Sequence, residues 1–381
     1  MSKTGHNKHI KILDIAKGLS IILMTLVHYP FTQGDNVYPN LSFLINDVLM
    51  IFVVPIFIFI SGYLMNDGSS FKAFLFDKID ALIKPLIGFL FSITILNIIK
   101  YSITADSIGL HGIISPVNAL LSVVIFGNLG FVNYALWFIV ALFWGLLALK
   151  GGIIIWDLKK PLKYVLLSIF VLLLVILNRT SVTAYYVVYV PVFFTFLGLG
   201  YIFKKWSDRY FNGISFFYSN VMFVFPILFS IGWFVLNKFK LRTDLDLFLF
   251  VFNYHYLLLL SIMGIFSVFF FCRYLEKIPY LNTVLIECSR ASFFILGLHI
   301  FILDVYRHIF DLKVYDPLLH FFLFGFNIFL CYIIYRILIQ TPFIRLLFVP
   351  LKRIELSESE IRLLKFKPIN RLIPKEILVL N

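Results

Sequence analysis

Three ionisable side chains in the first apolar segment have types and a spacing that could support group-transfer chemistry. Asp14, Lys17 and His28 all fall within residues 13–31. At about 100° and 1.5 Å per residue, Lys17 and His28 share one helix face and lie roughly 16 Å apart along the axis. Asp14 comes one turn before Lys17 and could pair with it. A lysine can hold a phosphate, and a neutral imidazole can take a proton from a hydroxyl.

Two interpretations of these residues stay open at this point. Asp14 and Lys17 could lie at the membrane interface, with Lys17 reaching toward the headgroups, and His28 could simply end the helix there. Alternatively, the three groups serve a function, because ionisable groups within a span are costly and usually functional. The spacing between Lys17 and His28 is similar to the reach of an extended pantetheine arm, although many other ligands are as long.

The composition indicates which class of protein must position these residues. The chain has 381 residues, of which 61% are hydrophobic and 14% charged, and its mean hydropathy is +0.96. Such values are typical of a polytopic membrane protein. The net charge of +13 is explained by basic cytoplasmic loops rather than by nucleic-acid binding. The three cysteines have no metal-site spacing and imply no disulfide framework, so we predict no metal site.

The apolar segments predict an all-α protein with about ten transmembrane helices. The ten segments of spanning length are 12–32, 43–65, 81–100, 134–150, 162–178, 185–203, 217–237, 247–271, 290–309 and 317–340. Residues 113–129 are apolar but short, and could be re-entrant or interfacial. Most Lys and Arg residues fall on alternate loops, which include the stretch between the eighth and ninth segments. This asymmetry predicts that both termini are cytoplasmic.

The two ends of the chain lead to separate predictions. The N-terminal basic and apolar run is too long for a signal peptide and lacks a small-residue cleavage site, so we expect a retained signal-anchor helix. After Pro342 the sequence mixes basic and apolar residues. We therefore predict a membrane domain over residues 1–342 and a basic amphipathic cytoplasmic tail over 343–381, lying on the anionic inner leaflet.

Four short motifs resemble the acyltransferase-3 family of integral membrane acyltransferases. They are the Lys17-x10-His28 spacing after Asp14, FIFISGYL at 57–64, LWFIVALF at 136–143 and ILGLHIFI at 295–302. The segment DIAKG at 14–18 resembles the family's fucose 4-O-acetylase-like branch. The resemblance implies transfer of an acyl group, usually acetyl from cytoplasmic acetyl-CoA, to a sugar hydroxyl of a cell-surface polysaccharide or its lipid-linked precursor. It also implies a multi-pass protein of the cell inner (plasma) membrane.

The resemblance assigns roles to two residues and shows two departures. His28 matches the family's catalytic histidine, and Lys17 matches its basic position. Many members have arginine where Lys17 stands, and lysine provides the charge without a bidentate fork. Many members also continue into an extracytoplasmic esterase-like domain, which we do not expect in this chain.

Candidate donor-binding residues gather toward the predicted cytoplasmic side. They are Lys17, Asp14, Ser61 and Lys72, with Lys84 as a further cation for the CoA phosphates. Ser61 and Gly62 interrupt an apolar run, where small residues could let the acyl carrier approach the backbone. For Gly62 we favour close helix packing instead.

Candidate acceptor-binding residues are Trp137, His299 and Asp304. Trp137 could line the acceptor path or belong to an aromatic belt. His299 could be a second site histidine or a hydrogen-bonded packing residue. Asp304 and Arg307 are three residues apart and are expected to form an ion pair; Asp304 could also orient His28.

Two other functional classes compete with an acyltransferase. A polysaccharide polymerase or flippase is disfavoured because a polymerase should carry a long basic outer loop, whereas residues 101–133 contain no Lys or Arg and only Asp106 as an acid. A secondary transporter should show acids at mid-membrane, whereas the acids here lie mostly at segment ends. The expected partners are acyl-CoA, a glycan or lipid-linked sugar acceptor, and membrane lipids, with no nucleic acid.

Overall fold

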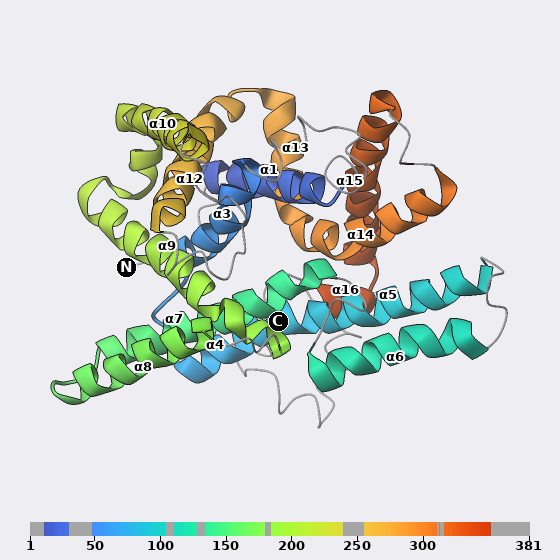
Figure 1. Cartoon of the computed structure of the whole chain (residues 1–381), viewed down its shortest axis with the longest axis horizontal. Helices are drawn as coiled ribbons and strands as arrows, with labels where there is room; N and C mark the ends of the chain where they lie inside the picture. Colours follow the sequence, from blue (N-terminus) through green and yellow to red (C-terminus); the bar gives the residue numbers. More distant parts are fainter. Residues whose placement is uncertain are drawn as a thin grey trace. The chain divides into compact units, whose positions relative to one another are not determined.

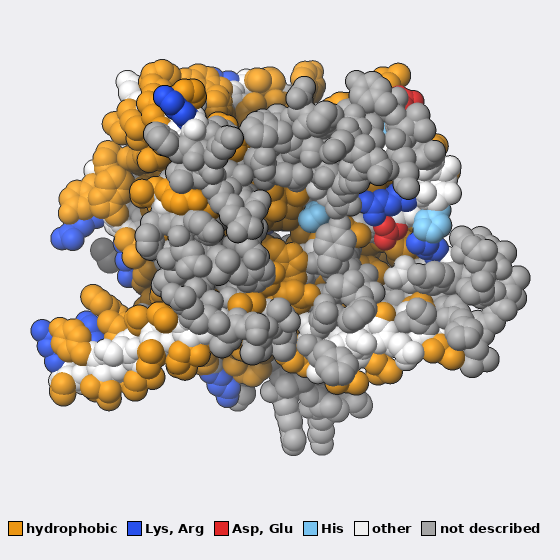
Figure 2. Space-filling view, viewed as in Figure 1, with side chains coloured by type: hydrophobic (Ala, Val, Ile, Leu, Met, Phe, Trp, Pro, Cys, Tyr) orange, Lys and Arg blue, Asp and Glu red, His pale blue; other side chains and the backbone are white. Residues whose placement is uncertain are grey.

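The structure is a computed structural model, and every regular element in its described part is a helix (Figure 1). The described residues are 11–29, 48–103, 110–127, 134–179, 184–238, 255–310, 312 and 316–351. Within these ranges the all-α prediction is confirmed. Figure 2 shows hydrophobic side chains over most of the described surface in that view, as expected for a protein surrounded by lipid.

Several helices have the length and apolarity needed to cross a membrane. Among the described residues, the six long ones are Phe71–Lys100, Trp137–Trp156, Tyr185–Tyr210, Tyr256–Leu275, Ser292–Ile309 and Pro317–Gln340. Shorter apolar helices are Met50–Tyr63, Leu162–Leu177 and Asn220–Leu236. The chain is therefore a polytopic membrane protein. Each of the ten predicted segments contains a helix in its described part, while the count of ten crossings and the cytoplasmic termini stay predictions.

The chain divides into two compact units. The first comprises Met1–Met65, Thr195–Leu296 and Leu303–Tyr332, and the second comprises Asn66–Phe194, Gly297–Ile302 and Ile333–Asn381. Segments far apart in the sequence thus belong to one unit. Each unit is described below by itself.

In the first unit, α1 packs against three other helices. These elements are α1 (Lys11–Val27), α3 (Met50–Tyr63), α12 (His255–Leu275) and α13 (Pro279–Arg290). The side chains of Ile12, Ile15 and Ala16 on α1 are completely buried. A Cβ added at Gly18 would collide with the backbone carbonyl of Leu285, so α1 and α13 meet at backbone distance.

The helix α13 was not expected, because the stretch between the eighth and ninth apolar segments was predicted to be an inner loop. Pro279 occupies its first position, where a missing N–H is harmless and the fixed φ suits a helix. Leu281, Leu285 and Cys288 recur at helical spacing, and the last two are buried. The stretch is too short and too polar to span a bilayer, so a search for apolar runs passes over it.

The remaining elements of the first unit are the part of α9 (Val190–Tyr210) from Thr195, η6 (Gly213–Tyr218), η7 (Asn220–Phe223), α10 (Val224–Lys238), the ends of α14 (Ser292–Ile309) and most of α15 (Pro317–Gln340). An aromatic cluster joins α9 and η6 to α12. Phe217 and Phe269 have ring centroids 4.5 Å apart, and those of Phe203 and Phe266 are 5.0 Å apart. Such ring pairs add stability beyond the area they bury, which gives some of the chain's 46 phenylalanines a packing role.

The second unit contains several long helices. Its elements are α4 (Phe71–Lys78), the π-helical turn η2 (Ile79–Ile83), α5 (Lys84–Ile103), α6 (Leu110–Phe126), η4 (Tyr134–Leu136), α7 (Trp137–Trp156), α8 (Leu162–Arg179), η5 (Ala184–Tyr189), the start of α9, the middle of α14, the end of α15 and α16 (Ile344–Phe348). The short apolar stretch 113–129 falls largely within α6, which packs against α5.

A polar clasp ties the segment after α16 to η2 and α5. The Lys84 ammonium lies 2.5 Å from Asp80 Oδ1 and donates to the Val349 carbonyl at 2.9 Å. The other Asp80 oxygen accepts from the Leu351 N–H at 2.8 Å. Phe348 packs on Phe89 with ring centroids 5.0 Å apart. Lys84 therefore holds the start of the tail, while its contact with the CoA phosphates stays a prediction; residues 352–381 lie outside the described part.

Candidate functional site

Lys17 lies against an aromatic ring contributed by another motif. Its side chain is partly buried, and its Nζ is 5.8 Å from the centroid of the Phe57 ring on α3. A ring face at this distance attracts a cation through its quadrupole. The segments DIAKG and FIFISGYL, which are separate in the sequence, therefore meet at this pair. Sequence reasoning did not identify Phe57, because periodicity predicts the face of a residue but not its partner.

His28 lies in the turn that ends α1 rather than on the helix itself. We expected the helix to continue through residue 31, but α1 ends at Val27. The N–H of His28 donates to the Thr25 carbonyl at 3.2 Å, and that of Tyr29 donates to the Leu26 carbonyl at 3.1 Å. Pro30 explains the early end, because the residue before a proline is disfavoured in the helical conformation. The imidazole is partly buried.

Polar groups of α14 lie close to the end of α1. Tyr29, next to His28, is 1% exposed and packs edge-on against Phe324 of α15, with centroids 5.6 Å apart. Tyr306 and Arg307 are within electrostatic range of the Tyr29 hydroxyl. The predicted ion pair between Asp304 and Arg307 is confirmed at 3.1 Å. That Asp304 orients His28 or contacts substrate stays a prediction.

The small residues of the second motif pack as expected for Gly62. A Cβ at Gly62 would collide with the Leu197 carbonyl of α9, which confirms the predicted close helix packing. The hydroxyl of Ser61 donates to the Phe57 carbonyl at 2.9 Å, within its own helix. Ser61 thus lies one turn from the ring that faces Lys17, while its contact with the donor stays a prediction.

The other two donor candidates lie on different helices. Asp14 is partly buried on α1, and its pairing with Lys17 stays a prediction. Lys72 is exposed near the start of α4 in the second unit. In the same unit Lys150 is almost completely buried and donates to the Asp67 carbonyl at 2.6 Å, which fixes the turn leading into α4.

Trp137, an acceptor candidate, belongs to an aromatic stack within the second unit. It is the first residue of α7, and its ring lies nearly parallel to that of Tyr189, with centroids 4.4 Å apart and 29° between the planes. Tyr186 stacks in turn on Tyr189 at 5.9 Å and 24°. Tyr185 and Tyr186 have φ values of 50° and 56°, a conformation that is rare for bulky residues. The stacking of Tyr189 on Trp137 and of Tyr186 on Tyr189 was not predicted from the sequence.

The remaining candidate, His299, is buried. It lies in the middle of α14 and is 1% exposed. Two residues before it, a Cβ at Gly297 would collide with the Phe89 ring within the same unit, so the helix is closely packed there. Within the residues that the structure describes, no group of three His, Cys, Asp or Glu side chains is placed to hold a metal ion.

The fold and the site define a multi-pass membrane protein in which the apolar helix α1 carries the cation of Lys17, and the turn that ends this helix carries the imidazole of His28. Comparison with protein families then identifies the class: residues 10–336 match the family described as an acyltransferase domain, so the chain belongs to the acyltransferase 3 family. It is therefore an acyl-transferring enzyme of the membrane. Comparisons with curated proteins and with solved structures give no match.

Proposed function

We propose that the enzyme is a membrane O-acyltransferase that moves an acyl group, most often acetyl, from acyl-CoA to a sugar hydroxyl of a cell-surface polysaccharide or its lipid-linked precursor. The observation that carries the proposal is the placement of Lys17 over Phe57 on the helix whose final turn leads into His28. A cation that could hold an anionic carrier thus lies on α1, and a candidate base lies in the turn that directly follows this helix. The motif resemblance to the fucose 4-O-acetylase-like branch supports a sugar acceptor.

The donor would bind along α1. The Lys17 ammonium would hold a phosphate of CoA, with Phe57 keeping the ammonium in place. Asp14 would orient Lys17, and Ser61 and Lys72 would contact other parts of the donor. Lys84 stays a further candidate cation for the phosphates, beside its contacts with Asp80 and the Val349 carbonyl.

His28 would act as the general base. Its neutral imidazole takes the proton of the acceptor hydroxyl while the hydroxyl oxygen attacks the thioester carbonyl carbon. The carbon–sulfur bond then breaks, and the proton passes to the departing thiolate. The products are an O-acyl sugar and free CoA. In an alternative route, His28 itself attacks the thioester to form an acyl-imidazole and free CoA, and the acceptor hydroxyl then takes the acyl group. Release of CoA in the absence of acceptor would distinguish this route from direct transfer.

The acceptor would contact aromatic and polar side chains. The stacked rings of Trp137 and Tyr189 offer broad apolar faces, which suit the C–H face of a sugar ring. His299 and Asp304 would hydrogen-bond to acceptor hydroxyls. We further propose that the protein lies in the cell inner membrane with ten crossings and both termini cytoplasmic, and that residues 1–342 form the catalytic membrane domain and 343–381 a tail on the inner leaflet.

The proposal is tested by measuring ester groups on the surface glycan of cells with and without this protein. We expect O-acetyl groups on the glycan only when the protein is present. In parallel, membranes containing the protein should consume labelled acetyl-CoA when the glycan is added and transfer the label to it. An identical glycan in both strains, together with no acceptor-dependent consumption of any acyl-CoA, would overturn the proposal.

A further inference from the structure

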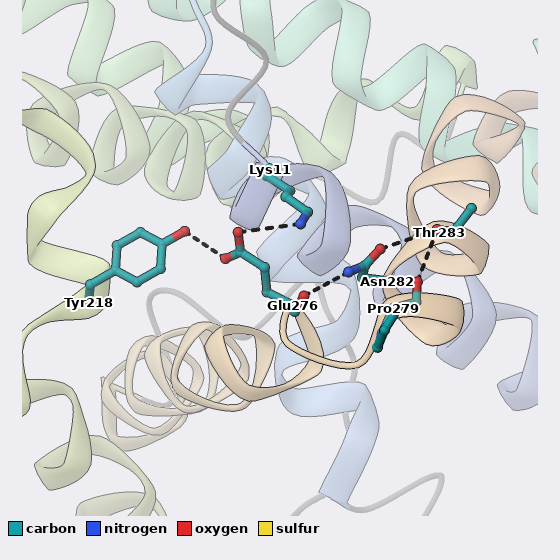
Figure 3. Close-up of polar contacts among 6 residues, drawn as sticks. All are labelled: Lys11, Tyr218, Glu276, Pro279, Asn282 and Thr283. Atoms are coloured by element: carbon teal, nitrogen blue, oxygen red, sulfur yellow. Dashed lines mark hydrogen bonds and ion pairs between the residues drawn. The ribbon is translucent and has the colours of Figure 1, made fainter.

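One residue, Glu276, contacts three segments through its carboxylate and its backbone carbonyl at the start of α1 (Figure 3). Its Oε1 lies 3.7 Å from the Nζ of Lys11, the first residue of α1. Its Oε2 accepts a hydrogen bond of 2.7 Å from the hydroxyl of Tyr218, the last residue of η6. The backbone carbonyl of Glu276 accepts from Asn282 Nδ2 of α13, also at 2.7 Å. Residues from α1, η6 and α13 thus converge on Glu276.

Hydrogen bonds hold the end of α12, next to Glu276, against the segment that contains η6 and η7, and we call these parts the frame. Glu276 follows directly after α12, and its N–H donates to the Cys272 carbonyl at 2.9 Å. Three residues earlier, Arg273 Nη1 donates to the Ser219 carbonyl at 3.1 Å. Two polar links therefore join the end of α12 to the η6–η7 segment. The ion pair with Lys11 connects the start of α1 to this fixed frame.

The ion pair adds a directional contact to the apolar packing of α1. Ile12 and Leu13 are at most 2% exposed, and the close approach at Gly18 restricts sliding along α13. An ion pair at 3.7 Å between partly exposed side chains is weak, but this one acts at the first residue of α1, before the close contact at Gly18. Because α1 is a rigid rod rising about 1.5 Å per residue, a shift at Lys11 moves Lys17, about 9 Å farther along, by the same amount.

We infer that Glu276 is a positioning residue, which fixes the start of α1 through Lys11 and so sets the placement of Lys17 and His28. The inference rests on the proposed function for its catalytic consequence. Its structural consequence, a change in the packing of α1 on α13, can be measured without any acyl transfer. Cys288 is suited to this measurement, because it is 5% exposed and lies one turn after Leu285, the residue that contacts Gly18.

The test compares Glu276→Gln, the single variants Lys11→Glu and Glu276→Lys, and the charge reversal Lys11→Glu/Glu276→Lys with the wild type, using the full-length protein in membranes. Lys277→Met is the matched control, because it removes a neighbouring exposed cation and leaves the network intact. For each variant, kcat and KM are measured for acetyl-CoA and acceptor, together with the rate at which N-ethylmaleimide modifies Cys288.

We expect E276Q to lower kcat about tenfold, since small misplacements of catalytic groups are costly, while KM for the acceptor stays within twofold. Alkylation of Cys288 should be at least threefold faster. The charge reversal should restore part of both values relative to either single change, because it restores the ion pair but not the hydrogen bond from Tyr218; K277M should match the wild type. If E276Q does not reach the membrane, Tyr218→Phe should show the same two effects at smaller size.

Three results would overturn the inference: wild-type kcat in E276Q, lower kcat with unchanged alkylation of Cys288, or a charge-reversed pair no better than the worse single variant. If the wild-type protein transfers no acyl group, the proposed function fails by itself. The alkylation rates then still decide whether Glu276 positions α1.

Discussion

The Nζ of Lys17 lies 5.8 Å from the centroid of the Phe57 ring, which places a cation of α1 over an aromatic face of α3 within one compact unit. Both residues belong to motifs that resemble the acyltransferase-3 family. The pair gives the lysine a defined position without removing its charge, as the binding of an anionic carrier requires.

Replacing Lys17 should therefore affect donor binding in a charge-dependent way. We expect Lys17→Met to raise KM for acetyl-CoA by tenfold or more, because the phosphate loses its cation. Lys17→Arg should keep at least a third of the activity, since a guanidinium also stacks on aromatic rings. Phe57→Leu should raise KM about two- to fivefold, the equivalent of a cation–π contact. Steady-state kinetics at varied acetyl-CoA measures all three, and equal KM values for K17M and the wild type would contradict the donor assignment.

Two glycines of α9 provide a matched test of helix packing. A Cβ at Gly200 would collide with the Phe59 carbonyl of α3, whereas a Cβ at Gly198 meets nothing within 4 Å. Gly200→Ala should destabilise the protein by about 1–3 kcal/mol, as overpacking does. Gly198→Ala should be neutral or stabilising, because alanine favours a helix over glycine. Thermal unfolding in mild detergent distinguishes the two, and equal unfolding temperatures would argue against this packing of α3 and α9.

Substitution of the tryptophans at the two ends of α7 should have different effects on KM for the acceptor. Trp137 stacks on Tyr189, whereas Trp156 at the other end of the helix is 59% exposed and has Lys163 over its ring at 3.9 Å. We expect Trp137→Ala to raise KM for the glycan about two- to tenfold, in line with the strength of aromatic contacts, with KM for acetyl-CoA unchanged. Trp156→Ala should change neither value. Similar acceptor kinetics in the two variants would assign Trp137 to an aromatic belt.

Cys288 should react slowly and with a displaced pH dependence. Burial, followed by the charge of Glu287, raises the pKa of its thiol to about 11. Since the thiolate is the reactive form, about one thiol in a thousand is ionised at pH 8. Its alkylation by N-ethylmaleimide should rise about tenfold per pH unit from pH 8 to pH 10. A cysteine in a short unfolded peptide, the reference, should level off above about pH 9.5, and a plateau of Cys288 at the same pH would show an ordinary thiol pKa.

The sequence predicted the features that depend on local pattern. The all-helical class, the Asp304–Arg307 pair and the close packing at Gly62 follow from hydropathy, from spacing along one helix and from residue size. The partners of Lys17 and Trp137 could not be predicted in this way. Phe57 and Tyr189 are distant in the sequence, and their approach depends on how whole helices pack.

Two helix boundaries were also predicted wrongly, because hydropathy alone does not show where a helix begins or ends. Hydropathy alone extended the first helix past Val27, although Pro30 already indicated an earlier end. The short helix α13 was read as a loop because its apolar residues form a stripe rather than a run. Glu276 was not singled out from the sequence, because its contacts with Lys11 and Tyr218 join elements that are distant in the sequence.

The central claim is that His28 is the base for acyl transfer, and substitution of this residue tests it most directly. Labelled acetyl-CoA and the glycan acceptor are added to membranes that contain equal amounts of wild-type protein or His28→Ala. We predict that H28A is present in the membrane and loses transfer by a factor of at least one hundred, the lower range for removal of a general base. Transfer by H28A at the wild-type rate would contradict the account.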